Sequence, residues 1–224
     1  MVIKMIRIKG LVKTFGAKKV LSGVDLHIRK GETYVMLGPS GCGKTTLLSC
    51  IKGLIPYDSG RINVKGDAAI MFQEPRLIPW KNCMENVQLG LTLQGRHDDG
   101  YVDELLEDMG LRPSKKLYPR QLSGGMCRRT ALARTLAVKP DILLLDEPFT
   151  NLDPKTKRKI EDLVGFIKER YGLTIILVTH SIEESLRFGD NIALMSGKNG
   201  KIRSTYKKHA ANLKDMLISE IKKD

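Results

Sequence analysis

The sequence predicts an α/β protein built on a mainly parallel sheet. Two continuous apolar runs, ILLL at residues 142–145 and TIILV at residues 174–178, have the character of strands buried on both faces. Segments with helical periodicity separate these strands, and such alternation implies a parallel sheet flanked by helices. The stretch from about residue 73 to residue 121 interrupts the alternation with mostly helical patterns. We therefore expect an inserted helical subdomain.

The composition is that of a globular chain with a sizeable core. Of the 224 residues, 42% are hydrophobic and 28% are charged. No apolar run approaches the roughly 18 residues that a membrane helix needs, and the first ten residues contain three basic side chains in place of an apolar signal core. We therefore expect a cytoplasmic location. The four cysteines form no C-x-x-C pair and are expected to be reduced thiols.

The net charge of +13 points to an anionic partner, which could be nucleic acid, a membrane surface or an anionic ligand. Aromatic residues are only 5% of the chain, and no RNA-binding aromatic pattern is present. The densest basic run, KTKRK at residues 155–159, begins a predicted helix and is interpreted as its solvated face. We expect no nucleic-acid partner and favour proximity to a membrane.

The first predicted elements are strands followed by one helix. Short strands at residues 6–8 and 26–28 surround a turn-rich stretch, and the β-rich run TYVML at residues 33–37 stops at Gly38. The pattern becomes helical from Lys44, and Gly53 suits the end of that helix.

The later elements alternate more regularly. A strand is expected at residues 68–72, and helices at residues 101–109 and 126–138. Another helix is expected from Pro154, a favoured first helical residue. Ser181 and Glu184 have the spacing of a capping box at the start of the next helix.

The segment GPSGCGKT fits the pattern G-x-x-x-x-G-K-[ST] and lies between a predicted strand and a predicted helix. Its glycines allow backbone N–H groups to curl around phosphate oxygens, Lys44 supplies positive charge, and the Thr45 hydroxyl is a possible Mg²⁺ ligand. A glycine-rich turn can match by chance, but the flanking strand and helix favour a phosphate loop. The predicted nucleotide contacts here are Gly38, Pro39, Ser40, Gly41, Cys42, Gly43, Lys44, Thr45 and Thr46.

Polar residues follow the predicted strands and are expected at the carboxyl edge of the sheet, where α/β folds bind ligands. Asp146 is expected to hold Mg²⁺ through water, and Glu147 to orient or deprotonate an attacking water. The alternative, two ordinary loop acids, is weakened because an acid after four aliphatic residues is costly unless it is paired. His180 follows TIILV and is expected at the same edge. The alternative is that it has only a structural role. The amide oxygen of Gln73 could reach Mg²⁺ or the water.

A second loop, LSGGM at residues 122–126, also opens a helix and has the makeup of an anion site. Together the motifs resemble those of the ATP-binding cassette (ABC) family of transport ATPases, in order, over about residues 7–201. They comprise the Walker A loop GPSGCGKTT, the Q-loop glutamine, the signature LSGGM, Walker B ILLLDE, the D-loop TNLD and the switch histidine.

The resemblance implies a P-loop NTPase fold, with a mainly parallel core sheet flanked by helices, an N-terminal antiparallel β portion and an inserted helical subdomain. It implies ATP hydrolysis with Mg²⁺, coupled to solute transport. It also explains the second loop: cassettes of this family pair head to tail, and the signature of one chain covers the nucleotide of the other. Closure of the homodimer would then depend on ATP.

The resemblance also assigns roles. Phe15 matches the aromatic residue that stacks on adenine. The implied catalytic residues are Glu147, His180 and Gln73, and the implied metal ligands are Thr45, Gln73 and Asp146. The implied further nucleotide contacts are Phe15, Ser123, Gly124, Gly125, Met126 and Asp153.

The segment FQEPRLIPW at residues 72–80 is similar to that of importer ATPases for nitrate, sulfonates, taurine and related compounds. This similarity implies a transmembrane permease subunit as partner, an external substrate-binding protein as an indirect partner, and a place on the cytoplasmic face of the membrane. Trp80 is then expected to contact the permease. The alternative is that Trp80 belongs to the core of the helical subdomain.

Several residues depart from the family pattern. Met126 cannot close a capping box with Ser123 as the commoner Gln could. Cys127 and Arg128 replace a basic residue and a Gln, and Ser181 stands where Asp often follows the switch histidine. None of these departures removes a catalytic group.

We expect one ABC ATPase domain over residues 1–224, with a helical subdomain at about 74–138 and a helical tail at 203–224. Two other functions stay open. A soluble cassette acting on nucleic acid or ribosomes would suit the net charge, but such chains usually carry two cassettes. The second open function is the ATPase of an exporter, and the segment FQEPRLIPW argues against it. The sequence does not name the solute.

Overall fold

The computed structural model describes residues 4–197, 200–208 and 210–222. Its centre is a six-stranded sheet in which every neighbouring pair is parallel except the last. This confirms the predicted fold class. The strands, in spatial order, are β5 (Ala68–Met71), β6 (Ile142–Asp146), β7 (Thr174–Thr179), β3 (Thr33–Leu37), β8 (Asn191–Met195) and β9 (Ile202–Lys207).

The central strands are buried on both faces, as their continuous apolar runs predict. Successive side chains of a strand point to opposite faces. Leu143 and Leu145 of β6 accordingly join one core cluster, which includes residues of the helices α2–α4, while Ile142 and Leu144 join the other, which includes residues of α1 and the small sheet. The sheet therefore separates two cores and has no solvated face at its centre.

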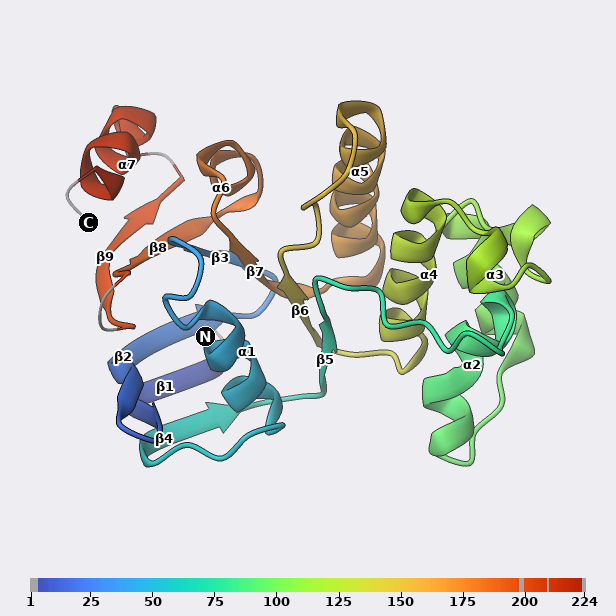
Figure 1. Ribbon diagram of the computed structural model, residues 1–224, viewed down its shortest axis with the longest axis horizontal. Helices are drawn as coiled ribbons and strands as arrows, with labels where there is room; N and C mark the ends of the chain where they lie inside the picture. Colours follow the sequence, from blue (N-terminus) through green and yellow to red (C-terminus); the bar gives the residue numbers. More distant parts are fainter. Residues whose placement is uncertain (1–3, 198–199, 209, 223–224) are drawn as a thin grey trace.

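A second sheet, in the order β2-β1-β4, is antiparallel throughout and forms the predicted N-terminal β portion. The strands expected at residues 6–8 and 26–28 are parts of two twelve-residue strands, which pair as a hairpin. Figure 1 shows this sheet beside α1, away from the helices α2–α4. Its strands are β1 (Lys4–Phe15), β2 (Lys18–Arg29) and β4 (Ser59–Val64).

The segment between β5 and β6 is helical, as predicted, although its division from the rest of the chain stays a prediction. In Figure 1, α4 lies between α5 and the pair α2 and α3. The helices are α1 (Lys44–Lys52), α2 (Cys83–Leu93), α3 (Asp99–Asp108), α4 (Gly124–Ala137), α5 (Pro154–Tyr171), α6 (Ile182–Phe188) and α7 (Leu213–Ile221). Within the described ranges, no helix combines the length and apolarity needed to cross a membrane.

The C-terminal segment differs from the predicted helical tail over residues 203–224. It begins as strand β9, which pairs antiparallel with β8, and only then forms α7, whose Leu213 and Leu217 are buried. Along β9 half-buried and exposed side chains alternate, and this period of two belongs to a strand. Residues 209, 223 and 224 of the predicted tail lie outside the described residues.

Only one of the two hydrogen bonds of the capping box predicted at Ser181 and Glu184 forms. The Ser181 hydroxyl accepts a hydrogen bond from the Glu184 backbone N–H. The Glu184 carboxylate instead accepts from the Thr179 hydroxyl and pairs with the Lys157 ammonium. A charge-assisted pair is stronger than a bond to a neutral amide, which explains the change of partner.

Candidate nucleotide site

The phosphate loop (residues 38–45) connects the buried end of β3 to the start of α1. Gly43, at the N-cap of α1, has a φ of 102° and offers no side chain to cap the helix. A Cβ atom there would lie 2.8 Å from the Val20 carbonyl oxygen, so only glycine fits. The first N–H groups of α1 are thus left to bind an anion.

Lys44 is held inside this loop. Its ammonium donates to the carbonyl oxygens of Gly38 at 2.8 Å and Pro39 at 2.7 Å, and the residue is only 4% exposed. The Glu147 carboxylate lies 3.9 Å from the same ammonium. The positive charge is therefore fixed beside the first N–H groups of α1, and not extended into solvent.

The Thr45 hydroxyl donates to the Asp146 carboxylate across 3.1 Å, so two of the three predicted metal ligands are in contact. Gln73, the third, lines the same cavity as Thr45. Hydroxyl and carboxylate oxygens are ligands that Mg²⁺ prefers. No three His, Cys, Asp or Glu side chains gather as metal ligands among the described residues, so a cation here would need oxygens from phosphate or water as well.

Glu147 is the centre of a small polar network. Its backbone φ of 45° lies in the left-handed region, which is uncommon for a residue with a side chain and typical of functional sites. Its carboxylate Oε2 lies 3.2 Å from His180 Nδ1 and accepts a hydrogen bond from the Thr150 hydroxyl at 3.2 Å. The structure thus brings the predicted water-activating residue and the predicted switch histidine together.

Phe15 ends β1 at the rim of the cavity, with 49% of its surface exposed. The Lys13 ammonium lies 5.0 Å from the centre of the Phe15 ring, and Asp58 binds both the Lys13 ammonium and the Thr14 backbone N–H. An exposed aromatic ring whose neighbouring residues are fixed in this way is suited to stacking on a flat base.

These residues enclose a cavity of about 400 Å³, which is large enough for a nucleotide to occupy in part. The predicted residues that line it are Phe15, Ser40, Gly41, Gly43, Lys44, Thr45, Thr46, Gln73 and Glu147.

The signature loop (residues 122–126) lies elsewhere. Ser123 caps α4 by accepting the Met126 N–H, with no reciprocal bond, as Met126 predicts. Ser123 and Gly125 line a separate cavity of about 420 Å³, which also contains Thr156 and Lys159 of α5. The two loops that suit phosphate therefore line different cavities of the described chain.

A family model described as ABC transporter matches residues 21–150. The chain belongs to the ABC transporter family. An aliphatic sulfonates import ATP-binding protein of Paracoccus denitrificans (strain Pd 1222) is 43% identical over 190 residues, which cover 85% of this chain and 77% of that protein. A protein of the same description from Bacillus subtilis (strain 168) is 40% identical over 214 residues, covering 92% and 84%.

Solved structures of ABC cassettes share the fold. A dimeric ATP-binding cassette in a post-hydrolysis state, bound to ADP and Pi, has a TM-score of 0.81 and 31% identity, covering 92% of this chain and all of that one. A second dimeric structure of a bacterial ABC transporter cassette has the same TM-score and 32% identity.

The remaining predicted residues do not line the main cavity. His180 lines a small apolar cavity on the other side of the phosphate loop, together with Gly38 and Pro39. Cys42 is buried within the loop. Asp153 caps α5 through the Thr156 N–H and does not line the nucleotide cavity. Gly124 is exposed at the first position of α4.

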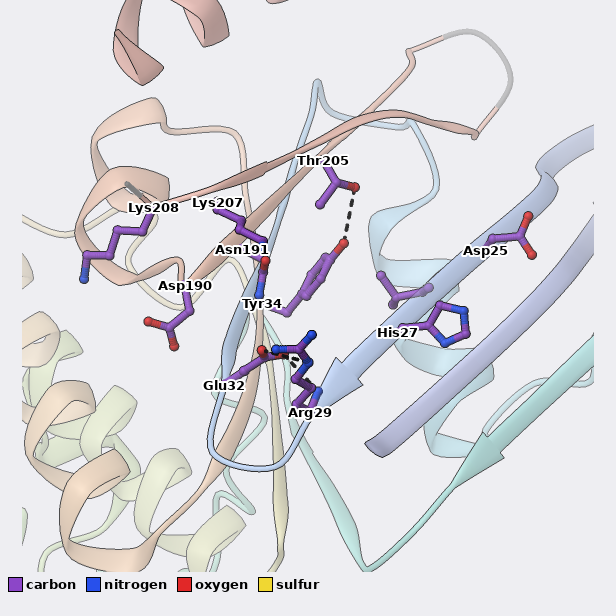
Figure 2. Close-up of a pocket in the computed structure, with 11 residues that line it drawn as sticks. Asp25, His27, Arg29, Glu32, Tyr34, Asp190, Asn191, Thr205, Lys207 and Lys208 are labelled. Atoms are coloured by element: carbon purple, nitrogen blue, oxygen red, sulfur yellow. Dashed lines mark hydrogen bonds and ion pairs between the residues drawn. The ribbon is translucent and has the colours of Figure 1, made fainter. Parts of the chain in front are cut away.

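A larger hollow of about 600 Å³ lies between β2 and the pair β8 and β9 (Figure 2). Some of its charges are paired: Arg29 pairs with Glu32, and Asp190 pairs with Lys168. The Tyr34 hydroxyl shares a hydrogen bond with Thr205. Charges of both signs line this hollow and do not select one class of ligand, so it does not compete with the phosphate loop as a functional site.

Two residues of the cassette's hydrolytic network escaped the sequence analysis. Thr150, known only as part of the D-loop, binds the Glu147 carboxylate. Arg128, noted only as a departure from the family pattern, donates to the Gln73 and Thr150 carbonyl oxygens. The Arg128 contacts join segments that are distant along the chain, and no sequence signal reveals them. The Thr150 contact spans only three residues, and it depends on the turn that follows β6.

We expect the nucleotide-free Asp146→Asn chain to be more stable than the wild type at pH 7. Burial raises the pKa of Asp146, outweighing the Thr45 hydrogen bond that lowers it, so the charged form opposes folding. Asn keeps the Thr45 contact and removes this cost, a gain on the order of 1 kcal/mol in the free energy of unfolding. Because a protonated Asp146 has no such cost, the gain should vanish below about pH 4. Thermal unfolding across this range measures it.

Asp153→Asn is the matched control, and its effect has the opposite sign. Hydrogen bonds from Thr156 lower the pKa of Asp153, so its charged form favours folding, and stability is lost as the pH falls. Asn caps a helix about as well as Asp, so the variant loses only the charge. An Asp146→Asn chain that is less stable than the wild type at pH 7 would contradict the burial argument.

Proposed function

We propose that the chain binds and hydrolyses ATP to drive a membrane importer for nitrate, a sulfonate, taurine or a related small solute. The observation that carries this proposal is the contact of Glu147 with both Lys44 and His180 at the mouth of the phosphate loop. The importer assignment is supported by the relatives, which are described as import ATP-binding proteins for aliphatic sulfonates.

In the proposed bound state, the phosphate loop holds the phosphates. The free N–H groups at the start of α1 face the phosphate oxygens, and Lys44 turns from the Gly38 and Pro39 carbonyls toward the outer phosphates. Phe15 stacks on the adenine ring from the rim of the cavity. Positive charge and aromatic surface thus bind the two ends of ATP separately.

Thr45 and Asp146 fit a Mg²⁺ ion, with Gln73 as a third oxygen donor on the same cavity. When bound, Mg²⁺ neutralises charge on the outer phosphate oxygens and fixes their orientation. The Thr45 hydroxyl and the Asp146 carboxylate, the latter through water, would hold the ion. Burial raises the pKa of Asp146, and a bound cation would favour its charged form.

Glu147 positions the attacking water, and its negative charge favours removal of the water's proton. His180 and Thr150 both bind the Glu147 carboxylate, and they fix its orientation. The residues of one chain therefore supply the water-activating group, whereas the signature loop of the same chain lines a different cavity.

The cover over the terminal phosphate comes from a second copy of the chain. The signature loop lines a cavity separate from the phosphate loop, so in a head-to-tail homodimer it is available to the nucleotide of the partner. The Ser123 hydroxyl and the Gly124 and Gly125 N–H groups would bind the terminal phosphate. Met126 and Asp153 would lie at the same interface. Dimeric structures of similar cassettes support this arrangement.

The permease partner is expected on the helical side of the cassette. Trp80 is 76% exposed, whereas Leu77 of the same run packs on the core. The buried Asn86 fixes this segment through hydrogen bonds with both the N–H and the carbonyl of Ile78. A rigidly held, exposed tryptophan argues against the subdomain-core interpretation and suits an anchor for a partner helix.

This partner would place the cassette on the cytoplasmic face of the membrane, with an external substrate-binding protein acting through the permease. We propose no nucleic-acid partner. The importer relatives favour neither a ribosomal function nor export.

Glu147→Gln should bind ATP as the wild type does but lose nearly all turnover, because the amide keeps the shape and cannot accept a proton. The variant should also accumulate as an ATP-bound dimer, which size-exclusion chromatography with and without ATP detects. Steady-state hydrolysis within about threefold of the wild type, a barrier change under ~1 kcal/mol, would exclude Glu147 from this role.

Trp80→Ala should leave folding and ATP affinity near normal, since the side chain is mostly exposed. It should weaken binding of the permease by about 2 kcal/mol or more, as loss of an aromatic anchor does. Co-purification and titration with the membrane subunit measure this loss. Tyr57→Ala, at another exposed aromatic residue (39% exposed) just before β4, is the control. Equal binding by both variants would remove Trp80 from the interface.

A further inference from the structure

Arg128, in the second turn of α4, is a buried arginine whose contacts are unusual. The residue is 6% exposed, and no carboxylate forms an ion pair with it in the described part of the chain. Its Nη1 donates to the Gln73 carbonyl oxygen at 2.6 Å, and its Nη2 donates to the Thr150 carbonyl oxygen at 3.0 Å. Its Nε has no hydrogen-bond partner among the described atoms.

This burial has a cost that the two carbonyl groups only partly offset. Removing a guanidinium from water is unfavourable unless its donors are satisfied, and burial lowers the pKa of Arg128. Arginine nevertheless stays charged in proteins. Separating either loop from α4 would leave a second donor without an acceptor. The buried charge therefore opposes any movement of α4 that the two loops do not follow.

Both carbonyl groups belong to loops that reach the hydrolytic site. Gln73 follows β5 and lines the nucleotide cavity together with Glu147. Thr150 donates through its hydroxyl to the Glu147 carboxylate and through its N–H to the Glu147 carbonyl. A continuous path of hydrogen bonds thus runs from Arg128 through Thr150 to Glu147.

A second arginine of α4 strengthens the attachment. Arg134 donates to the carbonyl oxygens of Pro75 at 2.7 Å and Arg76 at 2.8 Å. Together, Arg128 and Arg134 bind three of the four carbonyl groups in residues 73–76. The helix that begins at the signature loop is therefore tied along its length to the loop that contains Gln73.

We propose that Arg128 is a positioning residue that makes two events one movement: seating of the signature loop on the partner's nucleotide, and alignment of Gln73 and Glu147 in the chain's own site. The inference rests on the proposed head-to-tail dimer. Because each chain has both parts, closure at one site promotes alignment at the other, and the coupling is reciprocal.

The chemistry of arginine suits this task. Its planar fork places two nitrogens on two separate acceptors at once, whereas Lys has one nitrogen and Gln has one donor nitrogen. Gln is the residue usual at this position in the resembling family. We therefore expect tighter coupling with Arg128 than with Gln.

Arg128→Lys tests the proposal, with Arg129→Lys as the matched control. Arg129 lies on the same helix and also donates to carbonyl groups, but to those of Met109 and Gly110 at the end of α3. We expect Arg128→Lys to lower kcat about tenfold or more and to move the Hill coefficient for ATP from near two toward one, with half-saturation within about threefold. Arg129→Lys should keep the wild-type kcat and Hill coefficient.

A double-mutant cycle tests the path to Glu147. Thr150→Val removes the hydroxyl that binds Glu147 and leaves the carbonyl that Arg128 binds. If the path is shared, adding Thr150→Val to Arg128→Lys should lower kcat little further, within about threefold of the slower single variant. Two losses that simply multiply would show that Arg128 does not act through Thr150.

The possible outcomes distinguish failure of the Arg128 proposal from failure of the proposed head-to-tail dimer. If Arg128→Lys lowers only the melting temperature, and kcat per folded chain and the Hill coefficient stay unchanged, Arg128 is structural and the proposal is wrong. Should Arg128→Lys fail to fold, Arg128→Gln carries the same comparison. A wild-type chain with a Hill coefficient of one, and a specific rate independent of protein concentration, would refute the head-to-tail dimer and the coupling with it.

Discussion

The parallel pairing of β3, β7 and β6 is the constraint on which the site depends. Leu37 lies in register with Thr179, and Val178 with Asp146. This register places the phosphate loop, the two carboxylates and the switch histidine at one edge of the sheet, although they are far apart along the chain. A shift of one residue would move every side chain of a strand into the opposite core, and close packing in both cores makes this costly.

Much of the fold could be predicted because a strand that is buried on both faces has a recognisable run of apolar residues. The run at residues 142–145 is apolar at every position, the run at 174–178 is apolar after Thr174, and the structure buries all of them. The conformation of the C-terminal tail could not be predicted in this way, because β9 lies at the edge of the sheet and its residues alternate only weakly in polarity. Its pairing with β8 decides its conformation, and such pairing is not visible in a single strand.

The same limit applies to the site. The phosphate loop and the Asp146–Glu147 pair could be found because each is a short motif with its own chemistry. The contact of Glu147 with His180 is a tertiary feature, and neither the positive φ of Glu147 nor its bond with Thr150 has a distinct sequence signal. Arg128 illustrates this limit further. In the sequence it is only a departure from the family pattern, whereas in the structure its side chain joins α4 to two loops of the nucleotide site.

The central claim is that one chain provides the phosphate loop and another provides the cover. A mixture of Lys44→Ala and Ser123→Arg chains tests it most directly by ATP hydrolysis. Each variant alone should be inactive. In a mixed dimer one composite site carries both lesions and the other carries neither, so random pairing of a symmetric dimer should restore about a quarter of the wild-type sites. An inactive mixture, with mixed dimers shown to form, would contradict the claim.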